Sequence, residues 1–271
     1  MPQAIQTAHE TAGRFVAARL QALALPGFPG PLPDTLEAAY ACQDAAIDQW
    51  PDEVAGWKVG RIVPPWSARF APDRLVGPIF RRAIQGARAG EVLALPVFAA
   101  GFAAVEAEFV LRLAADAPPG KLAWTSAEAA ALVGELCIGI ESAGSPLTTI
   151  NDLGPAVVVA DFGNNNGLIV GPSIVNWHRT SLDSLSSETF VNGRPVGKGS
   201  AAAVPGGPLA ALAFTLTRCA ERGLPLKAGH FVSTGATTGI HVVGIGDRAR
   251  VSFGEVGEIL CRMVPAQPSA W

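Results

Sequence analysis

Two glutamates lie two positions apart in an apolar stretch of the chain, VEAEFVL (residues 105–111). If this stretch is a β-strand, Glu106 and Glu108 point to the same face, roughly 7 Å apart along the strand. Two such carboxylates repel each other, and water, an Arg or Lys partner or a divalent cation would have to offset that repulsion. Mg²⁺ and Mn²⁺ bind carboxylate oxygens, so the pair is a candidate metal site, although an exposed strand edge would explain the same residues.

A third carboxylate, Glu141, ends the apolar run of residues 136–140. Such a carboxylate is costly if it is buried without a partner, and it needs no explanation if it lies on the surface. Three carboxylates from two strands, Glu106, Glu108 and Glu141, could hold one octahedral cation and leave positions open for substrate or water.

Lys58 is a candidate catalytic residue because it lies in a low-polarity stretch, GWKVG (residues 56–60). The two glycines allow close backbone approach, and Trp57 and Val59 make the surroundings apolar. A desolvated lysine can act as acid, base or electrostatic clamp, and we expect burial and a nearby cation to lower its pKa. A strand lysine whose ammonium group reaches water is the alternative.

The polar loop DFGNNNG (residues 161–167) follows an apolar run, residues 156–160, that is predicted to be a strand. Asn and Gly favour turns, so a plain turn explains this composition as well. As a functional loop it would offer the Asp161 carboxylate and the Asn164 amide to a small polar ligand.

Two further loops contain candidate substrate-binding residues. Ser233, Thr234 and Gly235 end another predicted strand, and their hydroxyl and backbone N–H groups could receive a carboxylate. Lys198 lies in the Gly-rich stretch VGKGS (residues 196–200), which lacks the glycine spacing of a P-loop and therefore does not predict a nucleotide site.

Hydrolytic triads and zinc sites are not indicated. The chain has no G-x-S-x-G sequence, and its histidines are in no recognisable relation to a Ser or Cys. They also form no cluster of the kind that binds zinc. The histidines are His9, His178, His230 and His241.

Length and composition favour a β-rich architecture, as one large domain or as one domain with a small appendage. The 271 residues are 49% apolar and 16% charged, and the 30 Gly and 22 Pro predict many turns. A net charge of -3 without basic patches argues against nucleic acid as a partner. No apolar run reaches about 18 residues, so no membrane span is expected, and no signal peptide is recognised. Four widely spaced cysteines predict reduced core thiols and a cytoplasmic protein: Cys42, Cys137, Cys219 and Cys261.

The expected elements divide the chain into an N-terminal helical section, residues 1–55, and a β-rich catalytic domain, residues 56–271. Apolar residues at helical spacing predict a helix over 1–25 and a second one from Asp34, with Glu37 completing a capping box. Short apolar runs between Gly and Pro predict the strands of the second section. These are residues 56–62, 92–95, 104–113, 136–141, 156–160, 167–170, 188–192, 230–234, 248–253 and 258–264.

Two helices and one hairpin complete the expected pattern. A capping box of Thr125 and Glu128 predicts a helix over residues 125–136, and a second helix is predicted over 208–223. Asn192-Gly193 between apolar residues predicts a type I′ hairpin.

In order and spacing, these motifs resemble the 2-keto-4-pentenoate hydratase and 4-oxalocrotonate decarboxylase group of the fumarylacetoacetate hydrolase superfamily. The resemblance covers about residues 30–264. Its motifs are GWKVG (56–60), VEAE (105–108), IES (140–142), VAD (159–161) with its Asn/Gly loop, GKG (197–199), LKAG (226–229), STG (233–235) and GD (246–247).

The resemblance implies an α+β fold, a mixed β-roll or β-barrel of the fumarylacetoacetate hydrolase C-terminal-domain type with a small N-terminal helical section. It also implies Mg²⁺ or Mn²⁺ held by Glu106, Glu108 and Glu141, chelated by a 2-keto acid substrate. Lys58 corresponds to the family's acid/base or polarising residue. The implied activity is that of a lyase, a hydratase or decarboxylase, acting on a small 2-hydroxydienoate or 2-keto acid in aromatic meta-cleavage catabolism. Family members are homo-oligomers, and the decarboxylase associates with the hydratase.

The chain departs from the family pattern at three places, which leaves the substrate and the second proton-transfer group open. Ala103-Ala104 replaces an Arg before the two glutamates, Gly144-Ser145-Pro146 follows the third glutamate, and Asp73 is displaced from the family's Asp position. One alternative is a C–C bond hydrolase acting on an acylpyruvate, which would need a His paired with a carboxylate. Another is a non-catalytic subunit that binds a keto acid or serves in assembly.

Overall fold

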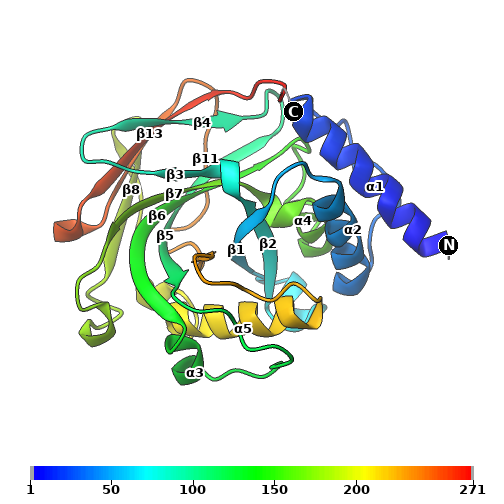
Figure 1. The fold of residues 1–271 in the computed structure, drawn as a ribbon. Helices are drawn as coiled ribbons and strands as arrows, with labels where there is room; N and C mark the ends of the chain where they lie inside the picture. The colour runs from blue at the N-terminus through cyan, green and yellow to red at the C-terminus, as the bar shows by residue number, and fades with distance from the viewer. Residues whose placement is uncertain (1–2, 270–271) are drawn as a thin grey trace.

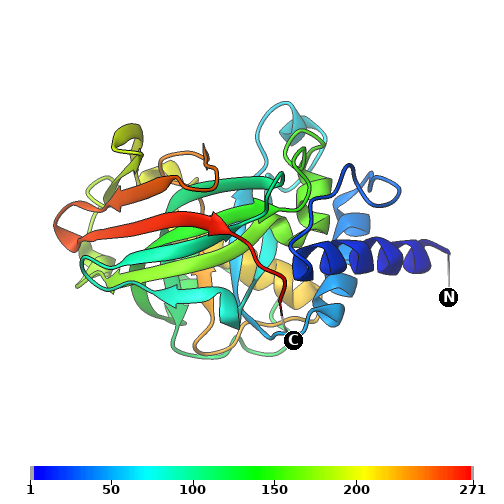
Figure 2. The same cartoon turned by 90° about the horizontal axis from the view of Figure 1, so that it is seen from above.

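The computed structural model describes residues 3–269 and contains two mixed β-sheets with helices at one end and along the bottom of the view (Figure 1). The larger sheet has the order β2-β1-β10-β5-β6-β7-β3, with β11 paired to β5, and the smaller has the order β4-β13-β12-β8-β9. In the view from above, the red and orange strands of the smaller sheet lie at the end opposite α1 (Figure 2). The expectation of an α+β fold is confirmed.

The helices are α1 (Gln3–Leu20), α2 (Leu36–Gln49), α3 (Ser126–Ala130), α4 (Pro155–Ala160) and α5 (Gly207–Glu221). The strands of the larger sheet are β1 (Val54–Arg61), β2 (Arg74–Phe80), β3 (Ile84–Gly86), β5 (Phe102–Leu113), β6 (Val133–Ser145), β7 (Asn165–Ser173), β10 (Phe231–Ser233) and β11 (His241–Val242). Those of the smaller sheet are β4 (Val92–Val97), β8 (Ser186–Val191), β9 (Arg194–Ser200), β12 (Arg248–Ser252) and β13 (Glu258–Pro265).

The two longest strands, β5 and β6, pair antiparallel along the middle of the larger sheet. The alternation read from the sequence holds: Ala107, Phe109 and Leu111 on β5 belong to the main hydrophobic core. Both faces of β5 are buried, so Glu106 and Glu108 lie inside the protein rather than on an exposed edge.

The helical section packs closely against the β-rich section. Phe15 of α1 lies in one apolar cluster with Leu147 and Val157, and Val16 lies in another with Phe80 and other residues outside the section. The expected boundary between residues 55 and 56 falls inside β1, and the division into two domains stays a prediction.

One predicted strand is wrong: residues 156–160 form helix α4. The run of valines suggested a strand, but Pro155 occupies the first helical turn and Gly154, with φ of 96°, lets the chain enter it. Burial of Ala156, Val157 and Val159 against neighbouring elements outweighs the strand preference of Val.

Several element limits also differ from the expectation. The N-cap of α2 is Thr35, whose Oγ1 accepts a hydrogen bond from Ala38 N at 3.1 Å, and Asp34 does not fill that position. The capping box at Thr125 is confirmed, but α3 ends at Ala130 because the following residues continue into β6. Helix α1 ends at Leu20, and the expected residues 1–2 lie outside the described part.

Strands β2, β3, β9 and β11 were not predicted as strands, although the turn between β8 and β9 was. Asn192 and Gly193 have φ of 51° and 77°, as the type I′ hairpin prediction requires. The four cysteines are buried and form no disulfide, as expected. No helix within residues 3–269 combines the length and the apolar character that crossing a bilayer requires.

Candidate active site

Three buried carboxylates converge on one face of the β5–β6 pair. Glu106 on β5 lies directly opposite Glu141 on β6, and Glu108 follows two residues along β5 on the same face. One carboxylate oxygen from each of the three lies within 4.8 Å of the others. The residues are only 5%, 0% and 0% exposed, so bulk water does not screen their mutual repulsion.

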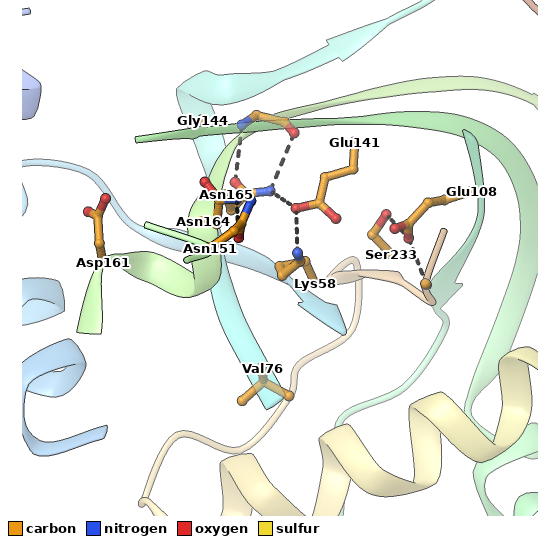
Figure 3. Close-up of polar contacts among 12 residues, drawn as sticks. Lys58, Val76, Glu108, Glu141, Gly144, Asn151, Asp161, Asn164, Asn165 and Ser233 are labelled. Carbon is orange, nitrogen blue, oxygen red and sulfur yellow. Dashed lines mark hydrogen bonds and ion pairs between the residues drawn. The ribbon is translucent and has the colours of Figure 1, made fainter. Parts of the chain in front are cut away.

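The hydrogen bonds of the site prepare two of these carboxylates for a cation. Oε2 of Glu108 accepts hydrogen bonds from Ser233 Oγ at 2.6 Å and Gly235 N at 2.8 Å. Oε1 of Glu141 accepts one from Asn165 Nδ2 at 3.1 Å and lies 3.2 Å from Lys58 Nζ (Figure 3). The second oxygen of each, Glu108 Oε1 and Glu141 Oε2, is buried and has no hydrogen-bond partner within residues 3–269.

These unpartnered oxygens are the observation that tests the fit of a metal. A buried carboxylate oxygen without a donor is unfavourable, and here two of them lie beside a third carboxylate. Oxygen ligands in this number suit Mg²⁺ or Mn²⁺, and donors that fix the other oxygens orient the ligands. The residues present therefore fit a divalent cation held by Glu106, Glu108 and Glu141.

Burial and crowding of charge shift the pKa values of the site. Burial raises the pKa of Glu106 to about 7, with Lys58 lowering it and Glu141 raising it. Burial, followed by the charges of Glu141 and Glu106, raises the pKa of Glu108 well above its usual value. Without a cation the site therefore holds protons at pH values where exposed glutamates have lost them.

The expected lowering of the Lys58 pKa assumed a nearby cation and stays a prediction, because the metal-free protein shows the opposite shift. Burial does lower the pKa of Lys58, but the carboxylates of Glu141, Glu106 and Glu108 raise it by more, and the net shift is upward. Lys58 is therefore a protonated ammonium group beside the three glutamates. A divalent cation among the same carboxylates would offset their charge and act in the opposite direction.

A cavity of about 650 Å³ opens beside this cluster, and several predicted site residues line it. Lys58, Glu106, Asn164, Thr234 and Gly235 all contribute to its wall. The rest of the wall is largely apolar and includes Trp66, Leu75, Phe102, Val158, Val204 and Ile240. The cavity therefore joins a charged end to an apolar body, as small-molecule sites do.

The loop of residues 233–235 donates hydrogen bonds to a candidate metal ligand and offers few free donors. The Ser233 hydroxyl and the Gly235 N–H both donate to Glu108, and the Thr234 hydroxyl donates to Phe109 O at 2.7 Å. These groups were expected to receive a substrate carboxylate, but their protons already have acceptors.

Two other predicted substrate-binding residues lie away from the cavity wall. Asp161 is buried, pairs with Arg19 at 2.5 Å and accepts a hydrogen bond from Ser145 Oγ at 2.5 Å, and it lies apart from the carboxylate cluster (Figure 3). Lys198 is exposed on β9 of the smaller sheet and does not line the cavity. The structure therefore does not bring Asp161 or Lys198 into direct contact with this site.

The sequence alone did not identify Asn165, Arg19 and two arginines of the cavity wall as residues of this site or its support. Asn165 stood in the Asn/Gly loop, which alone could have indicated it, whereas Arg19 was one charged residue in an amphipathic helix. Arg61 and Arg74 line the cavity and lie opposite each other on β1 and β2. Only the strand pairing, which the sequence did not predict for β2, brings them together.

The curled mixed sheet has a fold of the fumarylacetoacetate hydrolase type, as its likeness to two solved structures shows. The 4-oxalocrotonate decarboxylase of Pseudomonas putida G7, solved with magnesium and adipate, superposes with a TM-score of 0.78 at 20% identity, over 96% of this chain and 98% of that one. Fumarylpyruvate hydrolase of Pseudomonas aeruginosa, solved with Mn²⁺ and pyruvate, superposes with a TM-score of 0.55 at 17% identity, over 78% and 89%. The predicted fold is therefore confirmed.

Sequence comparison gives the same relationship over a shorter length. The chain is 35% identical over 107 residues to a 4-oxalocrotonate decarboxylase of Pseudomonas putida, and the match spans 40% of each protein. It is 29% identical over 211 residues, 73% of each protein, to REH2-associated factor 2 of Trypanosoma brucei brucei. No family model matches the chain. The resemblance to the 4-oxalocrotonate decarboxylase group is confirmed.

Proposed function

We propose that the chain is a divalent-metal-dependent lyase that acts on a small 2-keto acid or its 2-hydroxydienoate form, by decarboxylation or hydration. The observation that carries this proposal is the buried trio of Glu106, Glu108 and Glu141, with two oxygens unpartnered, beside Lys58 in a cavity of about 650 Å³. The decarboxylase relatives favour loss of CO₂ over hydration.

Mg²⁺ or Mn²⁺, held by the three glutamates, would supply a Lewis acid for the ketone oxygen and neutralise the keto acid. Lys58 lies in the cavity wall with its ammonium 3.2 Å from Glu141, and it can donate a proton to the substrate and later recover one. The largely apolar wall lowers the polarity around these charges and so strengthens their interactions.

Asn164 is the best-placed polar group for orienting the substrate. It lines the cavity, and its Oδ1 is buried without a hydrogen-bond partner among residues 3–269. This oxygen can accept a hydrogen bond from a substrate enol hydroxyl or from a reacting water.

The two cavity arginines favour a substrate with a second anionic group. Arg61 and Arg74 are cross-strand neighbours, and neither forms an ion pair with a carboxylate in the part of the chain that the structure describes. Like charges opposite each other on a sheet are unfavourable without a counter-ion. A keto diacid could place its distal carboxylate near this pair while its keto acid end reaches the carboxylate cluster.

The hydrolase alternative has less support from the cavity. Hydrolases of this superfamily are expected to activate water with a His paired to a carboxylate, and the cavity wall formed by residues 58–242 contains no histidine. A non-catalytic role is the second candidate, because a sequence match over 73% of the chain is to a protein named as an associated factor.

An ultraviolet assay of the purified protein with Mg²⁺ tests the proposal. The substrate panel should contain 2-hydroxydienoates and keto diacids, with product analysis that separates CO₂ loss, hydration and cleavage. We expect metal-dependent loss of CO₂ from a keto diacid or hydration of a dienoate. Cleavage to two acids would favour the hydrolase, and metal binding with no turnover on the whole panel would favour the non-catalytic role.

The assembly and location of the chain stay predictions. We propose a cytoplasmic homo-oligomer that associates with a hydratase or decarboxylase. Light scattering of the purified protein would check the first of these.

A further inference from the structure

Arg19 of the first helix is buried, although it lies far in sequence from the carboxylate cluster. Only 6% of the residue is exposed. Its Nε pairs with Asp161 Oδ1 at 2.5 Å, its Nη1 donates to Asn165 O at 3.1 Å and its Nη2 donates to Gly144 O at 3.0 Å. A buried guanidinium is tolerated when its donors are satisfied in this way, so its position and orientation are closely fixed.

Two acceptors of Arg19 lie near a candidate metal ligand, one on the same strand and one on the neighbouring strand. Gly144 is three residues after Glu141 on β6, and Asn165 begins β7. Asn165 also donates from its side-chain Nδ2 to Glu141 Oε1 at 3.1 Å. Arg19 therefore donates to the backbone carbonyl of Asn165, and the side chain of Asn165 donates to Glu141.

The β6–β7 pairing is irregular next to Asn165. Ala143 pairs with Asn165 and Glu141 pairs with Leu168, so the register shifts between the two pairs. Such a bulge interrupts the ladder and leaves the local backbone dependent on other contacts. Arg19, which bonds to both strands here, supplies two of these contacts, and hydrogen bonds between the Asn165 side chain and Gly167 supply others.

We propose that Arg19 is a positioning residue for the candidate metal centre. Through Asn165 it keeps Glu141 Oε1 occupied by a protein donor, which leaves Oε2 for the cation. The N-terminal helix is then part of the active site rather than an appendage. This inference rests on the proposed metal site, and it adds a residue outside the cavity on which metal affinity depends.

A purely structural role for Arg19 makes a different prediction. The guanidinium lies 5.0 Å from the centre of the Phe162 ring, and together with the Asp161 ion pair this contact would stabilise the fold with no effect on the metal. Such a role predicts a lower unfolding temperature with unchanged metal affinity. A positioning role predicts weaker metal binding at temperatures where the protein is fully folded.

Calorimetric titration with Mn²⁺ separates the two roles. In Arg19→Lys the ammonium can still pair with Asp161 but cannot also donate in the fork that reaches Asn165 and Gly144. We expect it to lower Mn²⁺ affinity about tenfold or more, as loss of contacts behind metal ligands typically does. The matched control is Val16→Ala, which removes buried apolar contacts of the same helix and should leave affinity within about twofold while lowering the unfolding temperature.

A double variant keeps the test decisive if Arg19→Lys does not fold. Arg19→Met with Asp161→Asn removes both members of the ion pair, leaves no unpaired buried charge, and releases Asn165. Native Mn²⁺ affinity in a folded Arg19 variant would overturn the positioning role alone. Absence of Mn²⁺ binding in the unmodified chain would overturn the metal site itself, and this inference with it.

Discussion

Replacement of Glu106 by Gln should make the metal-free protein more stable while it weakens metal binding. The pKa of Glu106 rises from 4.5 to about 7 on folding, mainly through burial. At about 1.4 kcal/mol per pKa unit, ionisation of this group costs the fold about 3 kcal/mol above pH 7. Gln has the same shape and no charge, so the variant avoids this cost.

The sign follows from proton linkage. The pKa of Glu106 is higher in the folded protein than in the unfolded chain. The protonated carboxyl therefore does not lower the free energy of unfolding below pH about 4.5, whereas its ionisation lowers it as pH rises through about 7. Glu106→Gln should therefore unfold several degrees higher than the native chain at pH 8 and by a smaller difference at pH 5. Saturating Mn²⁺ should raise the unfolding temperature of the native chain and have little effect on the variant.

Thermal unfolding at pH 5 and pH 8, with and without Mn²⁺, measures both effects. Glu135→Gln is the matched control, because Glu135 lies on the same strand pair with a side chain that is 43% exposed and paired with Arg112 at 3.1 Å. We expect this control to change stability by less than about 1 kcal/mol and to keep the Mn²⁺ shift. The reasoning is refuted if Glu106→Gln is destabilised at pH 8 and still responds to Mn²⁺ like the native protein.

Three further predictions follow from the site. Lys58→Met should keep Mn²⁺ binding in calorimetry and lose about a hundredfold or more of kcat, and full turnover would remove Lys58 from the mechanism. Arg61→Met and Arg74→Met should raise KM for keto diacids and leave KM for keto monoacids unchanged. Replacement of the exposed Arg248 by Met is the control. An equal change in KM for both substrate classes would contradict binding of the distal carboxylate by these arginines. Mn²⁺ affinity should fall as pH drops through about 7, because protons then compete for Glu106, and titrations between pH 5.5 and 8.5 that show constant affinity would disprove it.

Strands β5 and β6, which carry the candidate metal ligands, could be predicted because their local sequence pattern is typical of the buried strands that they form. Glu106 and Glu108 interrupt an apolar run at a spacing of two, and that period is a property of the strand alone. Their convergence with Glu141 also needed the register of β5 and β6, which the family resemblance implied and local pattern did not.

The errors share a physical cause, which is tertiary context. The valine run of α4 has strand propensity, yet its burial beside α2 and the proline at its start make it a helix. Asp161 looked like a ligand-binding carboxylate, and the buried Arg19 turns it into half of an internal ion pair. Neither partner can be recognised before the chain is folded, because the two lie 142 residues apart.

The central claim is that Glu106, Glu108 and Glu141 together hold one divalent cation. Anomalous diffraction from crystals grown with Mn²⁺ tests it most directly. We expect one strong peak per chain, bonded to an oxygen of each of the three glutamates, including Glu108 Oε1 and Glu141 Oε2, with Lys58 beside it. A peak bound elsewhere, or an ordered site with no peak at saturating Mn²⁺, would contradict it.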